Sequence, residues 1–363
     1  MPAVFIVFFS IASLSHRAAV MLCSGFFMIR ILCLHLAENQ ASYRYRVAQF
    51  LPYSKQHGVE MYPVCVVGKS YREKLKLAFE SANYDYVWLQ RKPLSPLLIN
   101  IIARRSRLVY DFDDALYATQ FGHRGRLKSK HPGSRSMVRR ISYLLRRCSL
   151  IFAGSDALYR YAERVHPGHV HLVPTALGKP EFFPSYCGDE KIVTIGWIGS
   201  NGNIPYLRLI DDAAFTIQKH YSHVRFSIMC GSPPEGLKTA WQFVPWSSDA
   251  EAEWLRSIDI GVMPLGDDEW SRGKCAFKLL QYMAYGKPVL ASAVGANNAT
   301  VVHDGNGFLA SSFAEWVACF EMLVQDSSRR KAFGEESRKR FESFYERAVV
   351  QEMIALLLQR GLC

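Results

Sequence analysis

Two lysines and a glutamine in the segment Gly273–Ser292 have the spacing of a ligand-binding helix face. At 100° per residue, Lys278, Gln281 and Tyr285 fall within about 60° of one another, and Lys274 joins them if the helix begins early enough. The positive N-terminus of a helix favours an anion, and an amide one turn further on can bond a sugar hydroxyl. The pattern therefore fits a pyrophosphate followed by a ribose. The alternative is a surface helix with solvated lysines, which an isolated run of this kind would favour.

A glycine-rich turn, Ile195-Gly-Trp-Ile-Gly-Ser-Asn-Gly-Asn203, adds a second element of the same kind. It follows a buried strand and leads into a helix predicted over Tyr206–Ile217. Backbone N–H groups at Gly199, Ser200 and Asn201 can cradle an anion, because glycine lets the backbone approach a ligand closely. Such a turn is a weak signal alone. Next to the lysine helix, it indicates a site for a nucleotide diphosphate.

Acidic residues follow the predicted strand Leu108–Asp111. Asp113 and Asp114 are candidate catalytic residues, because carboxylates at the carboxyl end of a strand can orient an acceptor hydroxyl or stabilise an oxocarbenium-like charge. The alternative is structural: an aspartate here can cap a short helix over Ala115–Tyr117, which stabilises the helix by about 1 kcal/mol. A second acidic run, Asp267-Asp-Glu269, could hold hydroxyls or a metal, although such a run more often neutralises nearby Arg and Lys side chains.

Short apolar runs alternate with helical stretches along most of the chain, which predicts parallel βαβ units. A linker containing Pro and Gly separates two such series, so we expect two α/β domains with the ligand cleft between them, at the carboxyl ends of the strands. Helices are predicted at 45–56 and throughout 327–359. The predicted organisation is an apolar leader at 1–27, a first domain at 28–180, a linker at 181–191, a second domain at 192–345 and a helix at 346–363 that crosses back to the first domain.

The leader contains two apolar runs, Val4–Phe9 and Val20–Phe27, which Ser15-His-Arg17 interrupts. Neither run is long enough to span a bilayer, and no basic residue precedes the first one as it would in a signal peptide. We therefore expect translation to begin at Met28, with a weak membrane anchor as the alternative. Nine scattered cysteines without a Cys-x-x-Cys pair indicate reduced thiols in a cytoplasmic protein.

The formal charge of +12 predicts an anionic partner. Residues 124–147 contain nine Lys and Arg residues and no Asp or Glu. An amphipathic basic helix in this segment would lie on acidic lipid, whereas the aromatic residues that stack nucleic-acid bases are sparse here. We expect peripheral association with the inner face of the plasma membrane and no nucleic-acid partner. The alternative is a solvated basic face.

Several motifs resemble retaining glycosyltransferases of family 4 in the sequence-based classification (glycosyl transferases group 1). They are Gly261-Val-Met-Pro-Leu, the block from Gly273 to Val289, Val294-Gly-Ala-Asn-Asn and Asp304-Gly-Asn-Gly-Phe-Leu, with weaker landmarks at Gly154-Ser-Asp-Ala-Leu, Val173-Pro-Thr and Phe183-Pro. The resemblance extends from Met28 to the C-terminus. It implies the GT-B fold, in which two Rossmann-like domains face each other across a cleft. It also implies sugar transfer from a nucleotide-diphosphate donor with retention of configuration, and no metal or other cofactor.

The same resemblance assigns roles to residues of the second domain. Lys278 and Lys274 would neutralise the pyrophosphate, and we count Lys278 as catalytic. The turn at Gly199 and the helix residue Leu279 would also bind the donor. Family members often carry two glutamates eight positions apart. The ribose-binding glutamate falls on Gln281, which can still bond a diol.

The sugar-binding glutamate of the family falls on Gly273, which has no side chain to contact the sugar. Either the neighbouring acidic run substitutes for it, or the sugar is held differently, or activity is impaired. In the first domain, Ser42, Arg44 and Arg46 resemble a serine-and-arginine turn that relatives present to the acceptor or to phosphate. An ordinary ion pair is the alternative for the two arginines.

We therefore predict a retaining glycosyltransferase that moves a sugar from a nucleotide sugar to a lipid-linked or saccharide acceptor, in the synthesis of bacterial surface polysaccharide, lipopolysaccharide or glycolipid. One alternative is a nucleotide-sugar epimerase, because such enzymes can share the fold. Another is a non-catalytic protein that binds nucleotide sugars.

Overall fold

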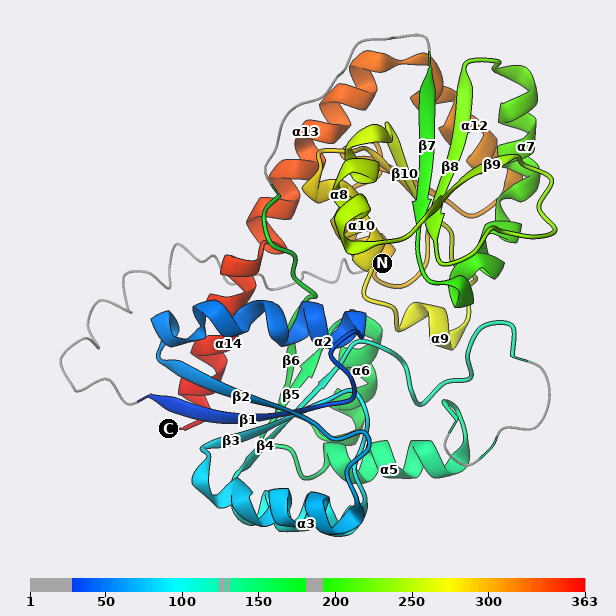
Figure 1. The fold of residues 1–363 in the computed structure, drawn as a ribbon. Helices are drawn as coiled ribbons and strands as arrows, with labels where there is room; N and C mark the ends of the chain where they lie inside the picture. Colours follow the sequence, from blue (N-terminus) through cyan, green and yellow to red (C-terminus); the bar gives the residue numbers. More distant parts are fainter. Residues whose placement is uncertain (1–27, 124–127, 129–130, 181–191, 363) are drawn as a thin grey trace.

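The structure, a computed structural model, describes residues 28–123, 128, 131–180 and 192–362. The predicted leader at 1–27 and the linker at 181–191 lie outside the described residues, as do six residues of the basic segment. The described chain forms two parallel six-stranded sheets with helices packed against them, one above the other in Figure 1. The prediction of two consecutive α/β domains is confirmed.

The first domain is built on a sheet in the order β2-β1-β3-β4-β5-β6. Its strands are β1 (Ile29–His35), β2 (Val59–Cys65), β3 (Tyr86–Gln90), β4 (Arg107–Phe112), β5 (Leu150–Ala153) and β6 (Val170–Leu172). Its helices are α2 (Ala41–Arg46), η1 (Ala48–His57), α3 (Tyr71–Glu80), η2 (Ser81–Asn83), α4 (Pro96–Ala103), α5 (Arg135–Leu145) and α6 (Asp156–Val165), where η marks a 3₁₀ helix.

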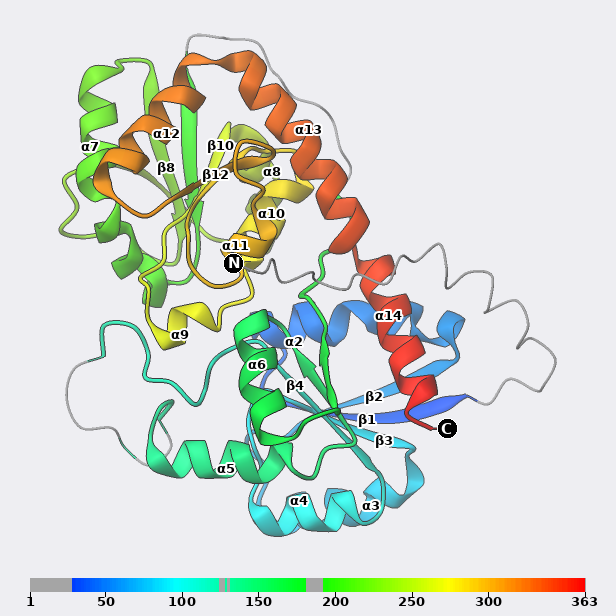
Figure 2. The same ribbon diagram turned by 180° about the vertical axis from the view of Figure 1, so that it is seen from behind.

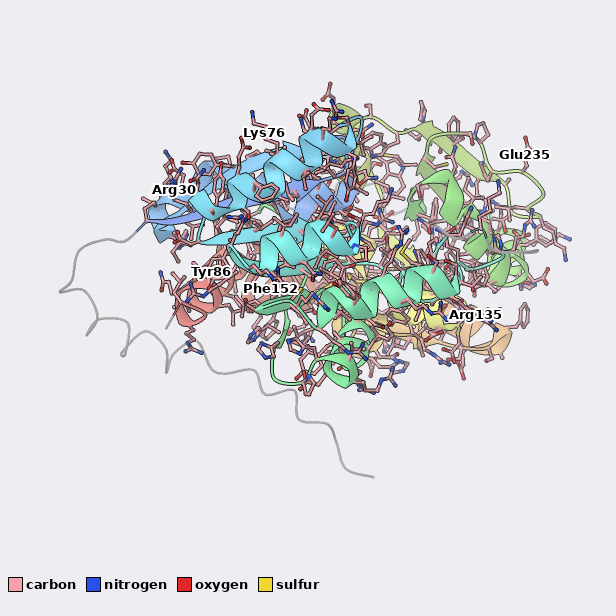
Figure 3. The ribbon with its side chains drawn as sticks, turned by 90° about the horizontal axis from the view of Figure 1, so that it is seen from below. Arg30, Lys76, Tyr86, Arg135, Phe152 and Glu235 are labelled. Atoms are coloured by element: carbon pink, nitrogen blue, oxygen red, sulfur yellow. The ribbon has the colours of Figure 1, made fainter. Side chains whose placement is uncertain are left out.

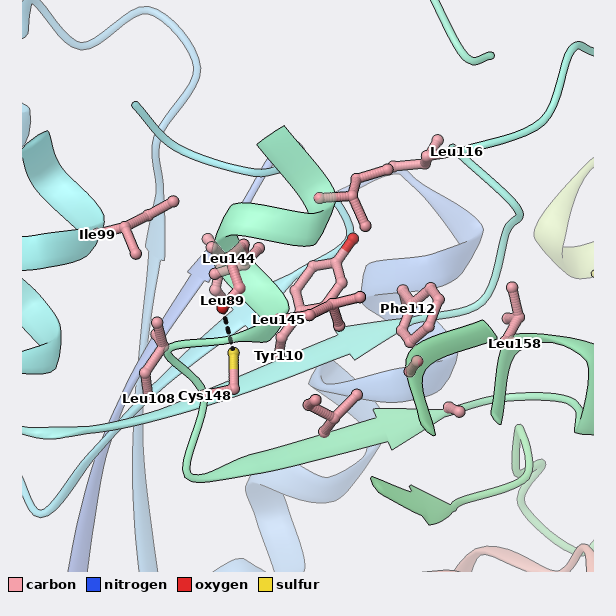
Figure 4. Packing of buried hydrophobic residues seen from close by; sticks show 14 of the residues in the cluster. Leu89, Ile99, Leu108, Tyr110, Phe112, Leu116, Leu144, Leu145, Cys148 and Leu158 are labelled. Carbon is pink, nitrogen blue, oxygen red and sulfur yellow. Dashed lines mark hydrogen bonds between the residues drawn. The ribbon is translucent and has the colours of Figure 1, made fainter. Parts of the chain in front are cut away.

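A continuous apolar core joins the sheet of the first domain to the helices α4, α5 and α6. Figure 4 shows Tyr110 and Phe112 of β4 among leucines of α5 and α6. The rings of these two residues stack with centroids 5.0 Å apart. Because the core reaches the end of β4, it fixes the backbone from which Asp113 and Asp114 emerge.

The second domain is built on a sheet in the order β12-β11-β10-β7-β8-β9. Its strands are β7 (Val193–Ile198), β8 (Val224–Cys230), β9 (Trp241–Pro245), β10 (Ile260–Met263), β11 (Val289–Ser292) and β12 (Gly307–Ala310). Its helices are η3 (Asn201–Leu209), α7 (Asp211–His220), α8 (Ser248–Ser257), α9 (Glu269–Arg272), α10 (Phe277–Ala284), α11 (Asn297–Thr300), α12 (Phe313–Gln325) and α13 (Ser327–Phe344).

The final helix, α14 (Arg347–Arg360), packs against the first domain. Figure 2 shows α13 running down the second domain and α14 continuing onto the first. Tyr86 of β3 donates a hydrogen bond to the Leu358 carbonyl over 2.7 Å, and Gln351 donates one to the Phe50 carbonyl over 3.2 Å. The first domain is therefore assembled from both ends of the described chain.

Three predicted helices differ from the structure, and two of them are replaced in part by a 3₁₀ helix that contains a proline. The helix predicted at 45–56 is α2 followed by the 3₁₀ helix η1, which contains Pro52, and the helix predicted at 206–217 is η3, which contains Pro205, followed by α7. Proline cannot donate an α-helical hydrogen bond. The stretch 327–359 is two helices that meet at Tyr345–Glu346. Among the described residues, no helix is long and apolar enough to cross a membrane.

Strand order places the candidate site in the second domain. The chain runs outward on either side of β7 and β10, so these neighbouring strands form a topological switch point. Ligands of parallel α/β sheets bind outside the carboxyl ends of the strands at such a point. The glycine-rich turn follows β7, and the lysine segment follows β10.

Candidate functional site

The two lysines of the second domain converge at the start of α10. Ala276 has a left-handed conformation with φ 53°, so α10 begins at Phe277 and Lys274 lies in the turn before it. The Lys274 Nζ is 3.3 Å from the Asn203 Oδ1, and the Lys278 Nζ is 5.4 Å from the centre of the Trp197 ring. The helix therefore begins too late for Lys274 to share its face, although the turn still brings Lys274 to η3.

Gly199 creates the space that Lys278 occupies. A Cβ atom at this position would be 2.8 Å from the Lys278 Cε and 2.7 Å from the Trp197 ring. Any side chain would therefore displace the lysine. The close approach explains the glycine here without any need for unusual backbone angles.

The Lys278 ammonium has no hydrogen-bonding or ion-pair partner among the residues that the structure describes. Burial, reinforced by the charge of Lys274, lowers the pKa of Lys278 to about 7, and Asp114 opposes this shift. A second positive charge nearby and little solvent leave the ammonium destabilised. A bound anion would remove that penalty, so the arrangement is suited to binding a phosphate group.

Two other predicted donor-side residues have structural roles. The Leu279 side chain lies in the core and its N–H donates to the Ala276 carbonyl, so neither group is left for a ligand. The Asn201 side chain accepts a hydrogen bond from the Gly231 N–H over 2.9 Å, which ties the turn after β7 to the turn after β8. Ser200 lies at the start of η3, and its side chain does not cap that helix.

The acidic pair of the first domain faces these lysines. Asp114 forms an ion pair with Arg91 at 2.5 Å, and it is close enough to Lys278 to raise the pKa of that lysine. Burial and then Asp114 raise the pKa of Asp113 to about 7, and the Asp113 Oδ1 has no hydrogen-bond partner among the described residues. The alternative role as a helix cap is wrong, because residues 115–117 form a turn and no helix.

Small residues bring the two domains into direct contact at this point. The Ser155 hydroxyl donates to the Gly273 carbonyl over 3.1 Å, and the Cys275 thiol donates to the Asp113 carbonyl over 3.2 Å. A Cβ atom at Gly273 would lie 2.5 Å from the Ala115 Cβ. The glycine that replaces the family's glutamate is therefore required by the position of the first domain.

We expect Gly273→Glu to separate the two domains locally, because the new side chain would overlap Ala115. The loss of nucleotide-sugar binding in the variant should exceed tenfold, measured by isothermal titration calorimetry. Ser222→Glu is the matched control, since this exposed residue precedes β8 and lies at the opposite end of the sheet from the contact. Equal affinity in the Gly273→Glu variant and the wild type would contradict this account of the contact.

The two arginines of the turn at Ser42–Arg46, which was predicted to bind the acceptor or phosphate, have different contacts in the structure. Arg46 is buried, and its Nε donates to both carboxylate oxygens of Asp111 over 2.9 Å. Further bonds reach the Thr175 hydroxyl and the Val173 carbonyl, so Arg46 has the ion-pair role left open by the sequence and is held inside the first domain. Burial lowers the pKa of Arg46, but Asp111 more than offsets this and the net shift is upward.

Arg44 lies at the boundary between the domains, with its guanidinium 5.4 Å from the centre of the Trp246 ring. The Ser42 hydroxyl is buried and has no partner among the described residues. A role for either residue in binding an acceptor or phosphate stays a prediction. His35, at the end of β1, is buried and stacked on Tyr43 with ring centres 3.7 Å apart.

Glu251 is a site residue that the sequence analysis missed. Its Oε1 accepts a hydrogen bond from the Gln281 Nε2 over 2.8 Å, and its Oε2 accepts one from the Trp246 Nε1 over 2.7 Å. The contact joins α8 to α10, thirty positions apart, and no spacing rule predicts it. The available signal was an acidic residue in the first turn of the helix that follows β9.

The acidic run after β10 neutralises its own surroundings. Asp267 pairs with the Arg272 Nε at 2.6 Å, and Asp268 caps α9 by accepting from the Ser271 N–H and hydroxyl. Within the part of the chain that the structure describes, no cluster of three or more His, Cys, Asp and Glu side chains could hold a metal ion. These contacts agree with the alternative that the acidic run neutralises nearby basic side chains.

Comparison with protein families finds a match over most of the second domain. Residues 190–326 match the family model of the glycosyl transferases group 1. The match covers the turn after β7, the lysine segment and the strands that position them. The resemblance of this part of the chain to the glycosyl transferases group 1 is thereby confirmed.

A curated relative and two solved structures extend the comparison. The D-inositol 3-phosphate glycosyltransferase of Pseudarthrobacter chlorophenolicus is 30% identical over 95 residues, which is 26% of this chain and only 21% of that protein. The structure of Anabaena Alr3699/HepE in complex with UDP and glucose has a TM-score of 0.68, 15% identity, and coverage of 91% of this chain and 99% of the other. WaaG, a glycosyltransferase involved in lipopolysaccharide biosynthesis, gives a TM-score of 0.64 and 14% identity, with 91% and 99% covered. These likenesses confirm the two-domain GT-B fold.

Proposed function

We propose that the protein is a retaining glycosyltransferase that uses a nucleotide-diphosphate sugar as donor. The observation that carries the proposal is Lys278, a lysine held beside Lys274 at the start of α10 without an anionic partner among the described residues, opposite two carboxylates of the first domain. This arrangement matches a leaving group with two negative charges. The glycosyl transferases group 1 match over the same segment supports it.

The geometry suggests how the chain would assist sugar transfer. Departure of the nucleoside diphosphate leaves negative charge on the pyrophosphate and positive charge on the sugar ring. Lys278, Lys274 and the N-terminus of α10 would stabilise the first charge, so we expect no requirement for a metal or another cofactor. Asp113 and Asp114 would stabilise the second, and Asp113, with a pKa near 7, could also exchange a proton with a sugar or acceptor hydroxyl.

The structural neighbours suggest the class of substrate. One neighbour was solved with UDP and glucose, and another acts in lipopolysaccharide biosynthesis. By analogy, we propose a saccharide or lipid-linked acceptor in the synthesis of a bacterial surface polysaccharide or glycolipid. The protein would then act in the cytoplasm, on the inner face of the plasma membrane.

The helix α5 supplies a surface for this membrane contact. Met137, Ile141 and Leu144 are buried against the first domain, whereas Arg135 and Arg139 are exposed. Figure 3 shows α5, with Arg135 labelled, next to α4 on the underside of the molecule. The segment 124–147 contains no acidic residue to offset these charges, so the face would bind acidic lipid rather than nucleic acid.

Reversing charge on α5 tests the membrane proposal. We expect Arg135→Glu/Arg139→Glu/Arg146→Glu to lower co-sedimentation with vesicles containing phosphatidylglycerol at least fivefold, because each basic residue near an acidic surface contributes about 1 kcal/mol. A triple reversal on the second domain is the control, at Lys219, Lys238 and Lys339. Equal sedimentation of both variants and the wild type would rule out this surface.

The proposed activity is tested with a panel of nucleotide sugars. A true donor should raise the melting temperature through ligand linkage, and incubation with membrane lipid extracts or saccharides should then transfer its sugar with unchanged anomeric configuration, read by NMR. Conversion of a UDP-sugar without any acceptor would instead indicate an epimerase. Tight binding without any reaction would indicate a non-catalytic binding protein, and no binding of any nucleotide sugar would refute the proposal.

A further inference from the structure

Both lysines of the candidate site lie against aromatic rings. The Lys278 Nζ is 5.4 Å from the centre of the Trp197 ring. The Lys274 Nζ is 5.7 Å from the ring centres of Tyr206 and Trp270. These distances are within the range of cation–π attraction. Trp197 differs from the other two rings because it supports Lys278, whose ammonium has no hydrogen-bonding or ion-pair partner in the described part of the chain.

The end of β7 brings Trp197 and Lys278 together from two different cores. The Trp197 ring is 1% exposed and packs in the core that contains α7 and α12. Leu279 and Met283 of α10 pack in the other core of the domain, so Lys278 reaches the indole across the end of the strand. The crossing point is Gly199, because a Cβ there would be 2.8 Å from the Lys278 Cε and 2.7 Å from the Trp197 Cη2. The end of the lysine therefore lies beside the six-membered ring of the indole.

The charged groups that act on Lys278 do not by themselves keep it protonated. Burial, followed by Lys274 in the turn before α10, lowers its pKa to about 7, and Asp114 of the first domain offsets this shift only in part. Asp114 is also paired with Arg91 at 2.5 Å, which weakens its effect on the lysine. Near neutral pH the charged and uncharged forms of Lys278 are therefore close in free energy. A modest additional attraction decides which form is populated.

An aromatic ring supplies such an attraction and leaves the lysine able to bind a ligand. The face of an indole attracts a cation more strongly than the ring of Tyr or Phe, and the attraction grows as water is excluded. A carboxylate in the same place would also stabilise the charge, but it would accept the N–H groups that a phosphate needs. An ammonium above a ring face keeps donors for an anion on its other side.

We propose that Trp197 is a positioning residue that holds Lys278 in its charged form, above the indole face and accessible to an anion, in the ligand-free protein. The inference rests on the proposed function only for the identity of that anion, a diphosphate. A tryptophan that only filled the core would be replaceable by any isosteric ring. The proposed role instead depends on the electron density of the indole.

The first test changes the electron density of the ring and leaves its shape almost intact. The protein is prepared with 5-fluorotryptophan, and the titration of Lys278 is followed by the NMR signal of its isotope-labelled Cε, which is assigned by its absence in Lys278→Ala. Fluorine withdraws electrons from the ring face, so the midpoint of the titration should fall by a few tenths of a pH unit. Trp197→Leu, which has no ring, should lower the midpoint by roughly one pH unit.

Trp197→Phe is the control for the other tryptophans, because the chain contains seven and all of them take up the label. Fluorotryptophan should leave the Lys278 midpoint of Trp197→Phe unchanged, which excludes an effect through Trp270 beside Lys274. If the label does not shift the midpoint of the protein that retains Trp197, the indole only fills the core and the inference is wrong. This titration requires no ligand, so its result does not depend on the proposed function.

A second measurement relates the charge of Lys278 to binding. At pH 6 the lysine is protonated with or without the indole, so Trp197→Phe and the wild type should bind a nucleotide sugar with similar Kd. At pH 8 Trp197→Phe should bind roughly three- to tenfold more weakly, because less of its lysine is charged. The ratio of the two Kd values cancels the titration of Asp113, which both proteins retain.

The outcomes of the two measurements separate the inference from the proposed function. An equal loss of affinity at pH 6 and pH 8 would assign Trp197 a role of shape alone and would overturn the inference, while the proposed function stands. If the wild type binds no nucleotide sugar, the proposed function fails, and the NMR titration still decides whether Trp197 holds the charge of Lys278.

Discussion

Replacing Lys278 with alanine should weaken binding of the nucleotide sugar by two to three orders of magnitude. The ammonium lacks an anionic partner in the ligand-free protein, and it would contact the diphosphate in a site with little solvent, where charge-assisted hydrogen bonds are strong. Lys339→Ala is the matched control, because that lysine is 77% exposed and its ion pair with Glu336 spans 3.6 Å. Calorimetry should show the large loss for Lys278→Ala alone.

The same lysine predicts how binding depends on pH. Burial and Lys274 lower the pKa of Lys278 to about 7 in the free protein, and a bound diphosphate should raise it again. Below pH 7 the lysine is already protonated, so its contribution to affinity is flat. Above pH 7 binding must take up a proton, and Kd should rise by up to about tenfold per pH unit until the pKa of the bound state is reached.

A nucleotide sugar is the appropriate ligand for this pH series, because its diphosphate has no group that titrates in the range. In Lys278→Ala the slope should be much smaller, and the remainder belongs to Asp113, whose pKa is also raised to about 7. Loss of affinity in Lys278→Ala no greater than in Lys339→Ala, or a wild-type Kd that is constant between pH 7 and 9, would exclude Lys278 as the main anion contact.

Removing one partner of the buried ion pair between Arg46 and Asp111 should have the largest effect on stability. Arg46→Met would leave Asp111 buried without its counter-ion, because the arginine supplies the ion pair and donates to both oxygens of this carboxylate. Breaking such a pair typically costs about 3–5 kcal/mol. The expected result is a lower urea midpoint for the transition of the first domain, followed by circular dichroism.

Asp156→Ala provides the comparison, since Asp156 pairs with Arg160 on the surface of α6 with exposures of 50% and 64%. This exposed pair should contribute less than about 1 kcal/mol. The double variant Arg46→Met/Asp111→Leu removes both charges and should recover part of the stability lost in Arg46→Met. Equal midpoints for Arg46→Met and Asp156→Ala would show that the buried pair contributes nothing unusual.

The sequence predicts those features that depend on short-range patterns. Alternating apolar runs predict both sheets, and Gly286 ends α10 with the expected left-handed conformation, φ 64°. The convergence of Lys278 with the turn at Gly199 also follows, because both belong to the carboxyl ends of adjacent strands.

Features that depend on contacts between distant segments do not follow from such patterns. Arg46 and Asp111 are 65 positions apart, and the sequence alone leaves the arginine free to bind phosphate or to form a pair. In the sequence, Gly273 marks only a missing carboxylate. The structure shows that a side chain at Gly273 would overlap Ala115, which belongs to the other domain. Glu251 acquires its importance only when α8 and α10 pack together.

The attachment of α14 to the first domain has a consequence for how the protein is made. The helix covers apolar residues of the first sheet, and it contributes Val350, Ile354 and Leu358 to their core. A ribosome synthesises the first domain's strands early, but their covering helix leaves the exit tunnel only after the whole second domain has been translated. The second domain should therefore complete its folding first. The first domain, although nearer the start of the chain, would reach its final packing only after α14 has left the ribosome.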